Sequence, residues 1–357
     1  MATIGIAGAG LLGRLLAWRL THAGYQVTVF DPARDGQPAF DGQGAAGFSA
    51  AGMLSPVAEL ESASAGVARQ GLRSIALWRQ IVTQLPGRPS LAERGSLMLA
   101  HRPDLAAAER VLARLRQAAD PALVAEALDA ARLRELEPAL SGMTHAWLLA
   151  CEAHIDTLGV MAALMAGAET ASWRFGAPVD RIERGRLHVP ALGWQGFDVV
   201  FDVRGTGARP DLPVRGVRGE TVWLHAPGLV LRRPLRLLHP RHRVYVVPRP
   251  DDLLIVGASQ IESEDRSEVS LKTAVELMTA AHSVLPQLSE ARIVRLDRNL
   301  RPALPDHEPR TDIQDGLARI NGLFRHGWLL APALVEDALG ALGLAQTLEP
   351  RREATPA

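Results

Sequence analysis

The residues best suited to chemistry are three glycines near the start of the chain, followed by a single acid. Gly8, Gly10 and Gly13 form the pattern Gly-x-Gly-x-x-Gly, and Asp31 lies further along. Gly8 allows a tight turn, Gly10 lets a pyrophosphate approach the backbone, and Gly13 lets a helix pack closely. Asp31 is placed to accept hydrogen bonds from a ribose and would repel a 2′-phosphate. The pattern indicates an adenine dinucleotide, and leaves NAD and FAD both open.

The elements around these glycines are those that such a loop requires. A predicted strand over 3–7 runs into the glycines, a predicted helix covers 14–23, and a second strand over 26–30 ends at Asp31. Leu11 and Leu12 lie in the turn, where the start of the helix offers free N–H groups and a partial positive charge to phosphate oxygens. The first 31 residues therefore predict a Rossmann-like nucleotide-binding unit.

Composition limits the class of protein and its partners. Of the 357 residues, 47% are hydrophobic and 22% are charged, which is typical of a globular protein, and the length favours two domains. Basic and acidic residues number 39 each, so nothing electrostatic favours a nucleic-acid or membrane partner. A basic cluster runs from Arg232 to Arg236 and continues through His239 to Arg243. We interpret it as a solvated loop and hairpin; an anionic surface site is the alternative.

Cysteine usage and hydropathy indicate the compartment. Cys151 is the only cysteine, so an intrachain disulfide or a cysteine metal cluster is excluded, and we predict no metal site. Arg14 and Arg19 interrupt the only long apolar stretch, and no basic leader precedes it. We therefore predict no signal peptide and no membrane span, which favours a cytoplasmic location.

Along the rest of the chain, helical and strand patterns separate into blocks. Residues 66–142 have mainly helical periodicity, with one short strand over 95–100. From 210 the pattern is strongly β and includes a predicted strand at 229–231. A helix is predicted over 271–284, and a last helix begins at Gly327.

The elements of nucleotide-binding type come in three separated pieces, with mainly antiparallel pieces between them. This interleaving is typical of a flavoprotein with an inserted substrate domain. We predict an α/β fold in which a Rossmann-like FAD-binding domain is interleaved with an α+β substrate domain built on a largely antiparallel sheet. The expected boundaries are 1–57, 143–209 and 297–349 for the first domain, 58–142 and 210–296 for the second, and 350–357 for a flexible tail.

Stretches along nearly the whole chain, from Ile4 to about Leu344, match a known family in the correct order. They are Gly8–Gly13 with Asp31, Ser49–Leu54, Tyr245–Arg249 with Ile255–Ala258, Leu300–Pro302, and Phe324–Pro332. On these residues the chain resembles the D-amino-acid oxidase superfamily, and most closely glycine oxidase of thiamine biosynthesis.

The resemblance implies a reaction and a cofactor. It implies that FAD accepts a hydride from a small amino acid such as glycine, giving an imine, while molecular oxygen is reduced to hydrogen peroxide; the imine would serve thiamine thiazole synthesis. Because no cysteine near the end of the chain could bond covalently to the flavin, we predict that FAD binds non-covalently. The sequence leaves open a sarcosine or D-amino-acid oxidase, a quinone-linked dehydrogenase, and a flavin-binding accessory protein without turnover. Assembly into a homo-oligomer is also left open.

The resemblance also assigns roles to individual side chains. Arg301 is expected to hold the substrate carboxylate, because a guanidinium forms two parallel hydrogen bonds to it. The hydroxyl of Tyr245 is expected to reach the same carboxylate, and Arg325 to contact the substrate or hold its loop. Met53 and His326 are expected to line the substrate pocket. His326 departs from the family pattern, in which asparagine is frequent.

The same resemblance assigns the cofactor contacts, with the start of the last helix facing the flavin. Arg204 departs from the usual small residue in its turn, and either a phosphate contact or a solvent-facing position is open for it. The expected contact residues are Gly8, Gly10, Leu11, Leu12, Gly13, Asp31, Ser49, Ala50, Ala51, Gly52, Met53, Val179, Gly205, Gly207, Arg301, Gly327, Trp328, Leu329 and Leu330.

Overall fold

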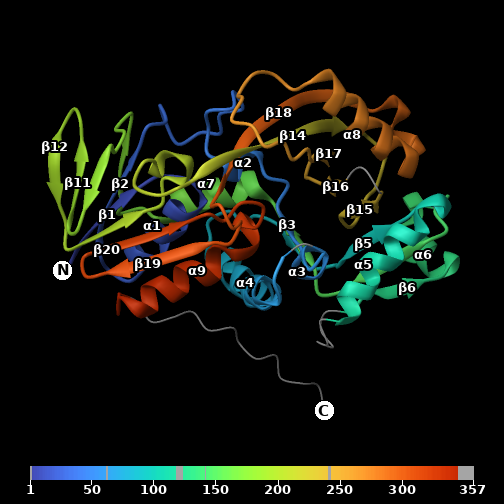
Figure 1. Cartoon of the computed structure of the whole chain (residues 1–357), viewed down its shortest axis with the longest axis horizontal. Helices are drawn as coiled ribbons and strands as arrows, with labels where there is room; N and C mark the ends of the chain where they lie inside the picture. The colour runs from blue at the N-terminus through green and yellow to red at the C-terminus, as the bar shows by residue number, and fades with distance from the viewer. Residues whose placement is uncertain (1, 62, 118–123, 141, 240–242, 345–357) are drawn as a thin grey trace, which may run out of the picture.

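A computed structural model describes residues 2–61, 63–117, 124–140, 142–239 and 243–344. The predicted flexible tail, 350–357, lies outside these residues. Two large sheets occupy opposite parts of the described structure (Figure 1).

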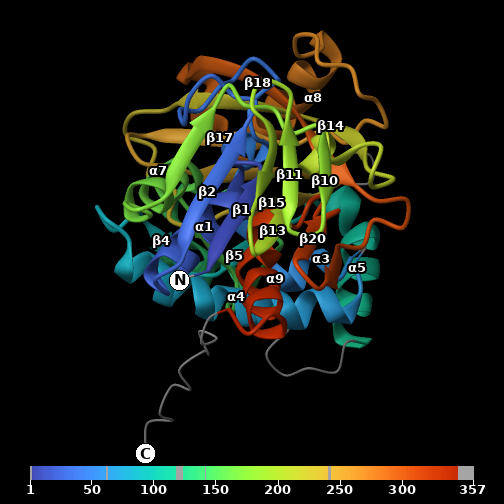
Figure 2. The same cartoon turned by 90° about the vertical axis from the view of Figure 1, so that its left-hand side faces the viewer.

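The first sheet is built mostly from parallel strands. Its order is β19-β20-β13-β1-β2-β9, and only the pairing of β19 with β20 is antiparallel. Figure 2 faces the end of the molecule that carries β1 and β2. The strands are β1 (Thr3–Ala7), β2 (Gln26–Asp31), β9 (Ser172–Phe175), β13 (Val199–Asp202), β19 (Arg310–Gln314) and β20 (Leu317–Asn321).

Helices from distant parts of the sequence pack together beside this sheet. α1 (Leu11–His22) contacts both α7 (Thr157–Gly167) and α9 (Gly327–Ala341), and α9 packs along α4 (Ala65–Gln84). The rings of Trp78 and Trp328 stack with their centroids 5.4 Å apart. The indole N–H of Trp78 also donates to the Trp328 carbonyl oxygen at 2.8 Å. Helices α1, α4 and α9 are therefore packed into one core beside the parallel sheet.

The second sheet is largely antiparallel. Its order is β18-β14-β17-β16-β15-β5-β7-β6, and only β15 and β5 pair in parallel. The strands are β5 (Ser96–Leu99), β6 (Glu126–Leu128), β7 (Ala146–Leu149), β14 (Arg215–His225), β15 (Leu235–Leu238), β16 (Arg243–Pro248), β17 (Leu253–Gly257) and β18 (Arg292–Ala303). Three helices accompany it: α5 (Leu105–Gln117), α6 (Ala130–Leu136) and α8 (Leu271–Val284).

Short elements complete the described structure. One three-stranded sheet contains β10 (Arg181–Glu183), β11 (Arg186–Val189) and β12 (Gly193–Gly196). Another has the order β3-β8-β4, from Met53–Leu54, Ala153–Ile155 and Leu91–Ala92. Two single-turn helices, α2 (Ala46–Ser49) and α3 (Pro56–Glu59), flank β3.

The predicted architecture, a Rossmann-like parallel sheet combined with a largely antiparallel one, is confirmed. The predicted strand over 229–231 is wrong: Leu229 N–H donates to the Ala226 carbonyl at 3.1 Å in a turn, and β15 begins only after Pro234. The domain boundaries stay a prediction. Strand β7, within the segment 143–209, pairs with β5 and β6 in the second sheet.

Strand β8 carries a partly buried histidine, His154, that makes stability depend on pH. Burial lowers the pKa of His154 from 6.5 to about 4, and nearby Arg249 and Arg94 add to the effect. As pH falls from 6.5 toward 4, the unfolded chain binds a proton that the folded chain excludes, so stability decreases over that interval.

We therefore expect His154→Phe to lose less stability on acidification than the parent protein. Between about pH 7 and pH 5, protonation of His154 in the unfolded chain should lower the free energy of unfolding of the parent protein by about 2 kcal/mol. Urea unfolding at both pH values measures the difference. Equal losses in the two proteins would show that His154 does not carry the effect.

Candidate active site

A cavity of about 1160 Å³ extends from the glycine-rich loop after β1 to the face of the antiparallel sheet. Two predicted contact residues do not line it: Gly13 packs against the backbone of Gly8, and Leu330 is fully buried in α9. The predicted residues that do line it are Gly8, Gly10, Leu11, Leu12, Asp31, Ser49, Ala50, Ala51, Gly52, Met53, Val179, Gly205, Gly207, Tyr245, Arg301, Arg325, His326, Gly327, Trp328 and Leu329.

The glycine-rich loop has the geometry of a phosphate cradle. Gly8 adopts φ +110°, and a Cβ there would lie 2.7 Å from the Val203 carbonyl oxygen. Gly10 has φ −72°, and a Cβ there would meet nothing nearer than Ala45 Cβ at 3.7 Å. Among the residues that the structure describes, no side chain caps the start of α1, so its first N–H groups stay available to an anion.

Asp31 is fixed at the end of β2 by backbone donors. Its Oδ2 accepts from Ala9 N–H at 2.6 Å, and its Oδ1 accepts from Ala33 N–H at 2.8 Å. These bonds hold the carboxylate at the rim of the cavity, where its remaining lone pairs can accept from ribose hydroxyls.

Arg204 is occupied by protein partners. Its guanidinium pairs with Asp202 at 2.8 Å and with Asp211 at 2.7 Å. It also donates to the Val179 carbonyl oxygen at 3.0 Å. Arg204 therefore fastens the segment at Val179 to the end of β13, and its positive charge is neutralised within the protein.

The stretch from Ser49 to Met53 is held by side chains from the antiparallel sheet. Asn299 of β18 donates to Ser49 Oγ at 3.1 Å. Arg249, at the end of β16, donates to the Ile155 carbonyl at 2.6 Å and to the Ala51 carbonyl. Gly52 has φ +67°, a conformation that favours glycine. The small residues here leave backbone facing the cavity.

The start of α9 also faces the cavity without a side-chain cap. Trp328, in its first turn, donates from its indole N–H to the Gly47 carbonyl at 3.0 Å. A helix start in this position favours negative charge.

Arg301, on β18, places a cation at the inner end of the cavity. Its Nη1 donates to the carbonyls of Ser259 at 3.1 Å and Arg218 at 3.3 Å. Within the described residues no carboxylate lies in ion-pair range of it, and burial lowers its pKa. A half-buried guanidinium whose hydrogen bonds, among the described residues, go only to carbonyls is able to bind an incoming carboxylate.

Two glycines make room for the predicted substrate-binding side chains. A Cβ on Gly219 would lie 2.5 Å from Arg301 Cζ, so the guanidinium rests against bare backbone of β14. A Cβ on Gly257 would lie 2.6 Å from the hydroxyl oxygen of Tyr245, its cross-strand partner. Burial raises the pKa of Tyr245, so its hydroxyl remains protonated and can donate to an anion.

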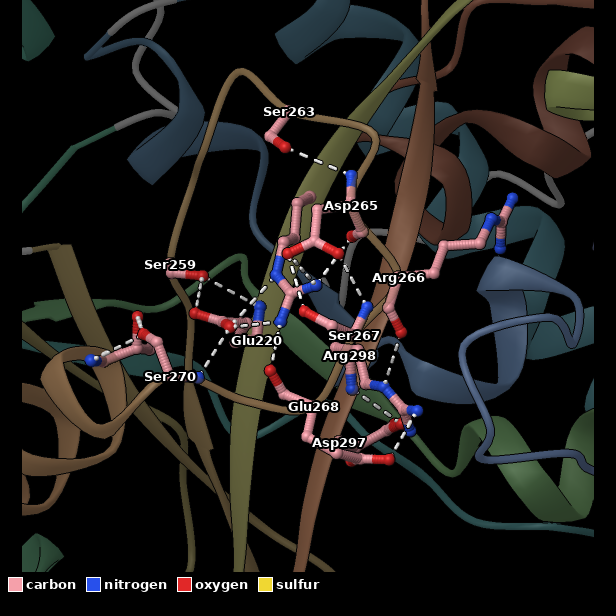
Figure 3. A network of polar contacts seen from close by, with 12 residues as sticks. Glu220, Ser259, Ser263, Asp265, Arg266, Ser267, Glu268, Ser270, Asp297 and Arg298 are labelled. Atoms are coloured by element: carbon pink, nitrogen blue, oxygen red, sulfur yellow. Dashed lines mark hydrogen bonds and ion pairs between the residues drawn. The ribbon is translucent and has the colours of Figure 1, made fainter.

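The loop that holds Arg301 is itself anchored by Glu220 (Figure 3). This buried carboxylate accepts from Arg218 at 2.7 Å, from the Ser270 N–H at 3.1 Å and from Ser259 Oγ at 3.2 Å. Both ends of the loop 259–270 are therefore fixed, and with them the Ser259 carbonyl that orients Arg301.

Glu59 and Arg236 belong to the same end of the cavity, and the sequence interpretation missed both. Glu59 lies 3.2 Å from Arg325, 3.7 Å from Arg236 and 3.5 Å from His326 Nδ1. Burial lowers the pKa of His326, which favours its neutral form. The solvated-loop interpretation is wrong for Arg236, which is only 7% exposed because β15 directs it inward.

Comparisons with known proteins agree with this geometry. A family model described as FAD dependent oxidoreductase (DAO) matches residues 3–337. The chain is 36% identical over 352 residues to a Rhizobium etli protein named thiamine biosynthesis oxidoreductase ThiO, covering 98% of this chain and 99% of that protein.

Two solved structures share the fold. Glycine oxidase from Geobacillus kaustophilus has a TM-score of 0.80 at 22% identity, covering 99% of this chain and 100% of that chain. Iminodiacetate oxidase from Chelativorans sp. has a TM-score of 0.81 at 22% identity, covering 99% of this chain and 98% of that chain. Among the described residues, no helix is long and apolar enough to cross a membrane.

The family match spans both sheets and every part of the cavity described above. Together with the relative that is 36% identical along nearly its whole length, it shows that the chain belongs to the family of FAD-dependent oxidoreductases.

Proposed function

We propose that the protein oxidises glycine, or a similarly small amino acid, to the imine, and that the imine serves thiazole formation in thiamine synthesis. The observation that carries the proposal is Arg301, a half-buried guanidinium that faces the cavity and has no carboxylate partner within the described structure. The similarity to ThiO of Rhizobium etli and to glycine oxidases supports the substrate class.

The residues around the cavity fit FAD. Gly8 and Gly10 provide a cradle that side chains would fill, and Asp31 would accept hydrogen bonds from the ribose hydroxyls. The uncapped start of α9 would stabilise negative charge at the other end. When bound, FAD would accept a hydride from the substrate and pass the electrons to oxygen. With Cys151 as the only cysteine and far from α9 in sequence, we propose non-covalent binding.

The protein's own residues orient the substrate. Arg301 and the Tyr245 hydroxyl would bind its carboxylate, which fixes the Cα and amine relative to the cofactor. Met53 and His326 would bound the space around the Cα. We also propose the domain division predicted from the sequence and a cytoplasmic location, with homo-oligomerisation left open.

The direct test is reduction of the bound flavin without oxygen. The flavin absorbance of the purified protein should bleach rapidly when glycine is added. Sarcosine, D-alanine and D-proline should be tested in the same way as alternative substrates. Bleaching by sarcosine or D-alanine but not by glycine would reassign the substrate. A protein that binds FAD yet is bleached by no amine would be an accessory flavoprotein, and the proposal would fail.

Gly219→Ala should weaken substrate binding without unfolding the protein. The new Cβ would crowd the Arg301 guanidinium, which is the free end of a long side chain and can move aside. Because a small misplacement of a positioning group costs about tenfold to a hundredfold, KM for glycine should rise by about that factor. Gly196→Ala, with nothing near its added Cβ, is the matched control. An unchanged KM would argue against this placement of Arg301.

A further inference from the structure

Three arginines line the inner end of the cavity, and two of them already have carboxylate partners. Arg325 lies 3.2 Å from Glu59. Arg236 lies 2.7 Å from Glu61 and 3.7 Å from Glu59. Within the described residues, Arg301, in contrast, donates only to backbone carbonyls. Within the described part of this region, one guanidinium is therefore left for an incoming carboxylate.

Glu59 is the carboxylate on which this charge balance depends. It ends α3 and lines the cavity, whereas Glu61 does not. Its side chain is only 14% exposed, and it contacts both Arg325 and Arg236. A substrate with a second carboxylate would reach these arginines only by displacing Glu59, and it would meet the negative charge of Glu59 on the way. Such like-charge contacts are a common means of excluding a competing ligand.

We infer that Glu59 determines the charge of the substrate: it holds Arg325 and Arg236 in ion pairs, so the pocket accepts amines with one carboxylate and excludes those with two. This inference rests on the proposed function only in assigning the first carboxylate to Arg301. It explains why a pocket with three arginines suits glycine, which has a single carboxylate.

The first test measures binding and needs no turnover. Acetate and malonate are titrated into the FAD-bound protein at about pH 8, where both are ionised, and flavin absorbance reports occupancy. The parent protein should bind acetate at least about tenfold more tightly than malonate. In Glu59→Gln the ratio should shift toward malonate by about tenfold or more, the size of one charge-assisted hydrogen bond.

Two further variants separate charge from shape. Glu59→Asp keeps the negative charge and should keep most of the preference for acetate. Glu61→Gln removes a charge that pairs with Arg236 outside the cavity lining, so it should shift the ratio far less than Glu59→Gln. An equal shift in Glu61→Gln would overturn the assignment to Glu59.

The second test measures catalysis with glycine and iminodiacetate. Glu59→Gln should raise kcat/KM for iminodiacetate relative to glycine by about tenfold. An unchanged ratio in a folded, FAD-bound variant would overturn the inference, as would equal affinities for acetate and malonate in the parent protein. If no amine bleaches the flavin, the proposed function fails, yet the carboxylate titration still decides the role of Glu59.

Discussion

Replacing Arg301 with alanine is expected to lower kcat/KM for glycine by about two to four orders of magnitude while FAD stays bound. Removing one partner of a buried charge pair costs about 2–5 kcal/mol. Among the described residues, Arg301 donates hydrogen bonds only to the carbonyls of Ser259 and Arg218, so its loss removes few structural bonds. The effect should therefore appear in substrate binding. Steady-state kinetics and anaerobic flavin titration measure it directly.

The control for this variant lies on the same strand. Arg292 is exposed at the other end of β18, so Arg292→Ala should leave kcat/KM unchanged. Arg301→Lys should restore little activity, because an ammonium cannot form the two parallel hydrogen bonds of a guanidinium. An apparent glycine affinity in Arg301→Ala equal to that of the parent protein would refute the assignment of the carboxylate site.

The second large effect is expected from Gly10→Val, which should fold but lose FAD. Gly10 has an ordinary negative φ, and an added Cβ would meet no protein atom nearer than 3.7 Å. The valine would instead occupy the space that a pyrophosphate needs. Overpacking of this kind costs about 1–3 kcal/mol, so FAD affinity should fall by about one to two orders of magnitude or more.

Far-ultraviolet circular dichroism and flavin absorbance of the purified protein separate folding from cofactor binding. Gly10→Val should keep the dichroism of the parent apoprotein and lose its yellow colour. Gly196→Val, on the exposed strand β12, should lose neither. A Gly10→Val protein that retains FAD in full would show that the pyrophosphate does not approach this glycine.

The cofactor half of the site could be predicted from the sequence because its signals are local. Gly8, Gly10 and Asp31 lie within one strand–turn–helix–strand segment, and the spacing itself encodes the geometry. The parallel sheet followed from the same segment. The later matches at Tyr245 and Arg301 depended on resemblance to a family, since nothing local to them indicates a shared pocket.

The substrate half contains residues that no local pattern reveals. Glu59 follows an ordinary proline-started turn, and Arg236 belongs to a basic run that is indistinguishable in sequence from a solvated loop. Only the register of β15 against β5 and β16 turns Arg236 inward. Gly219 matters because the guanidinium of Arg301 lies against it. The pairing of β14 with β18 places Arg301 opposite Val217, two residues from Gly219. The roles of Glu59, Arg236 and Gly219 therefore depend on tertiary contacts, which the local sequence does not reveal.

The strand order of the first sheet has a consequence for how the protein is made. β1 precedes the other strands of this sheet in the sequence, yet the sheet continues on one side through β13 to β20, and α1 packs against α9, which follows all of them. Arg19 of α1 and Glu336 of α9 form a buried ion pair, with Nη2 and Oε2 3.0 Å apart. During synthesis, the glycine-rich loop therefore leaves the ribosome long before the helices that bury its supporting layer. The nascent chain must therefore extend as far as α9 before the nucleotide site has its full framework.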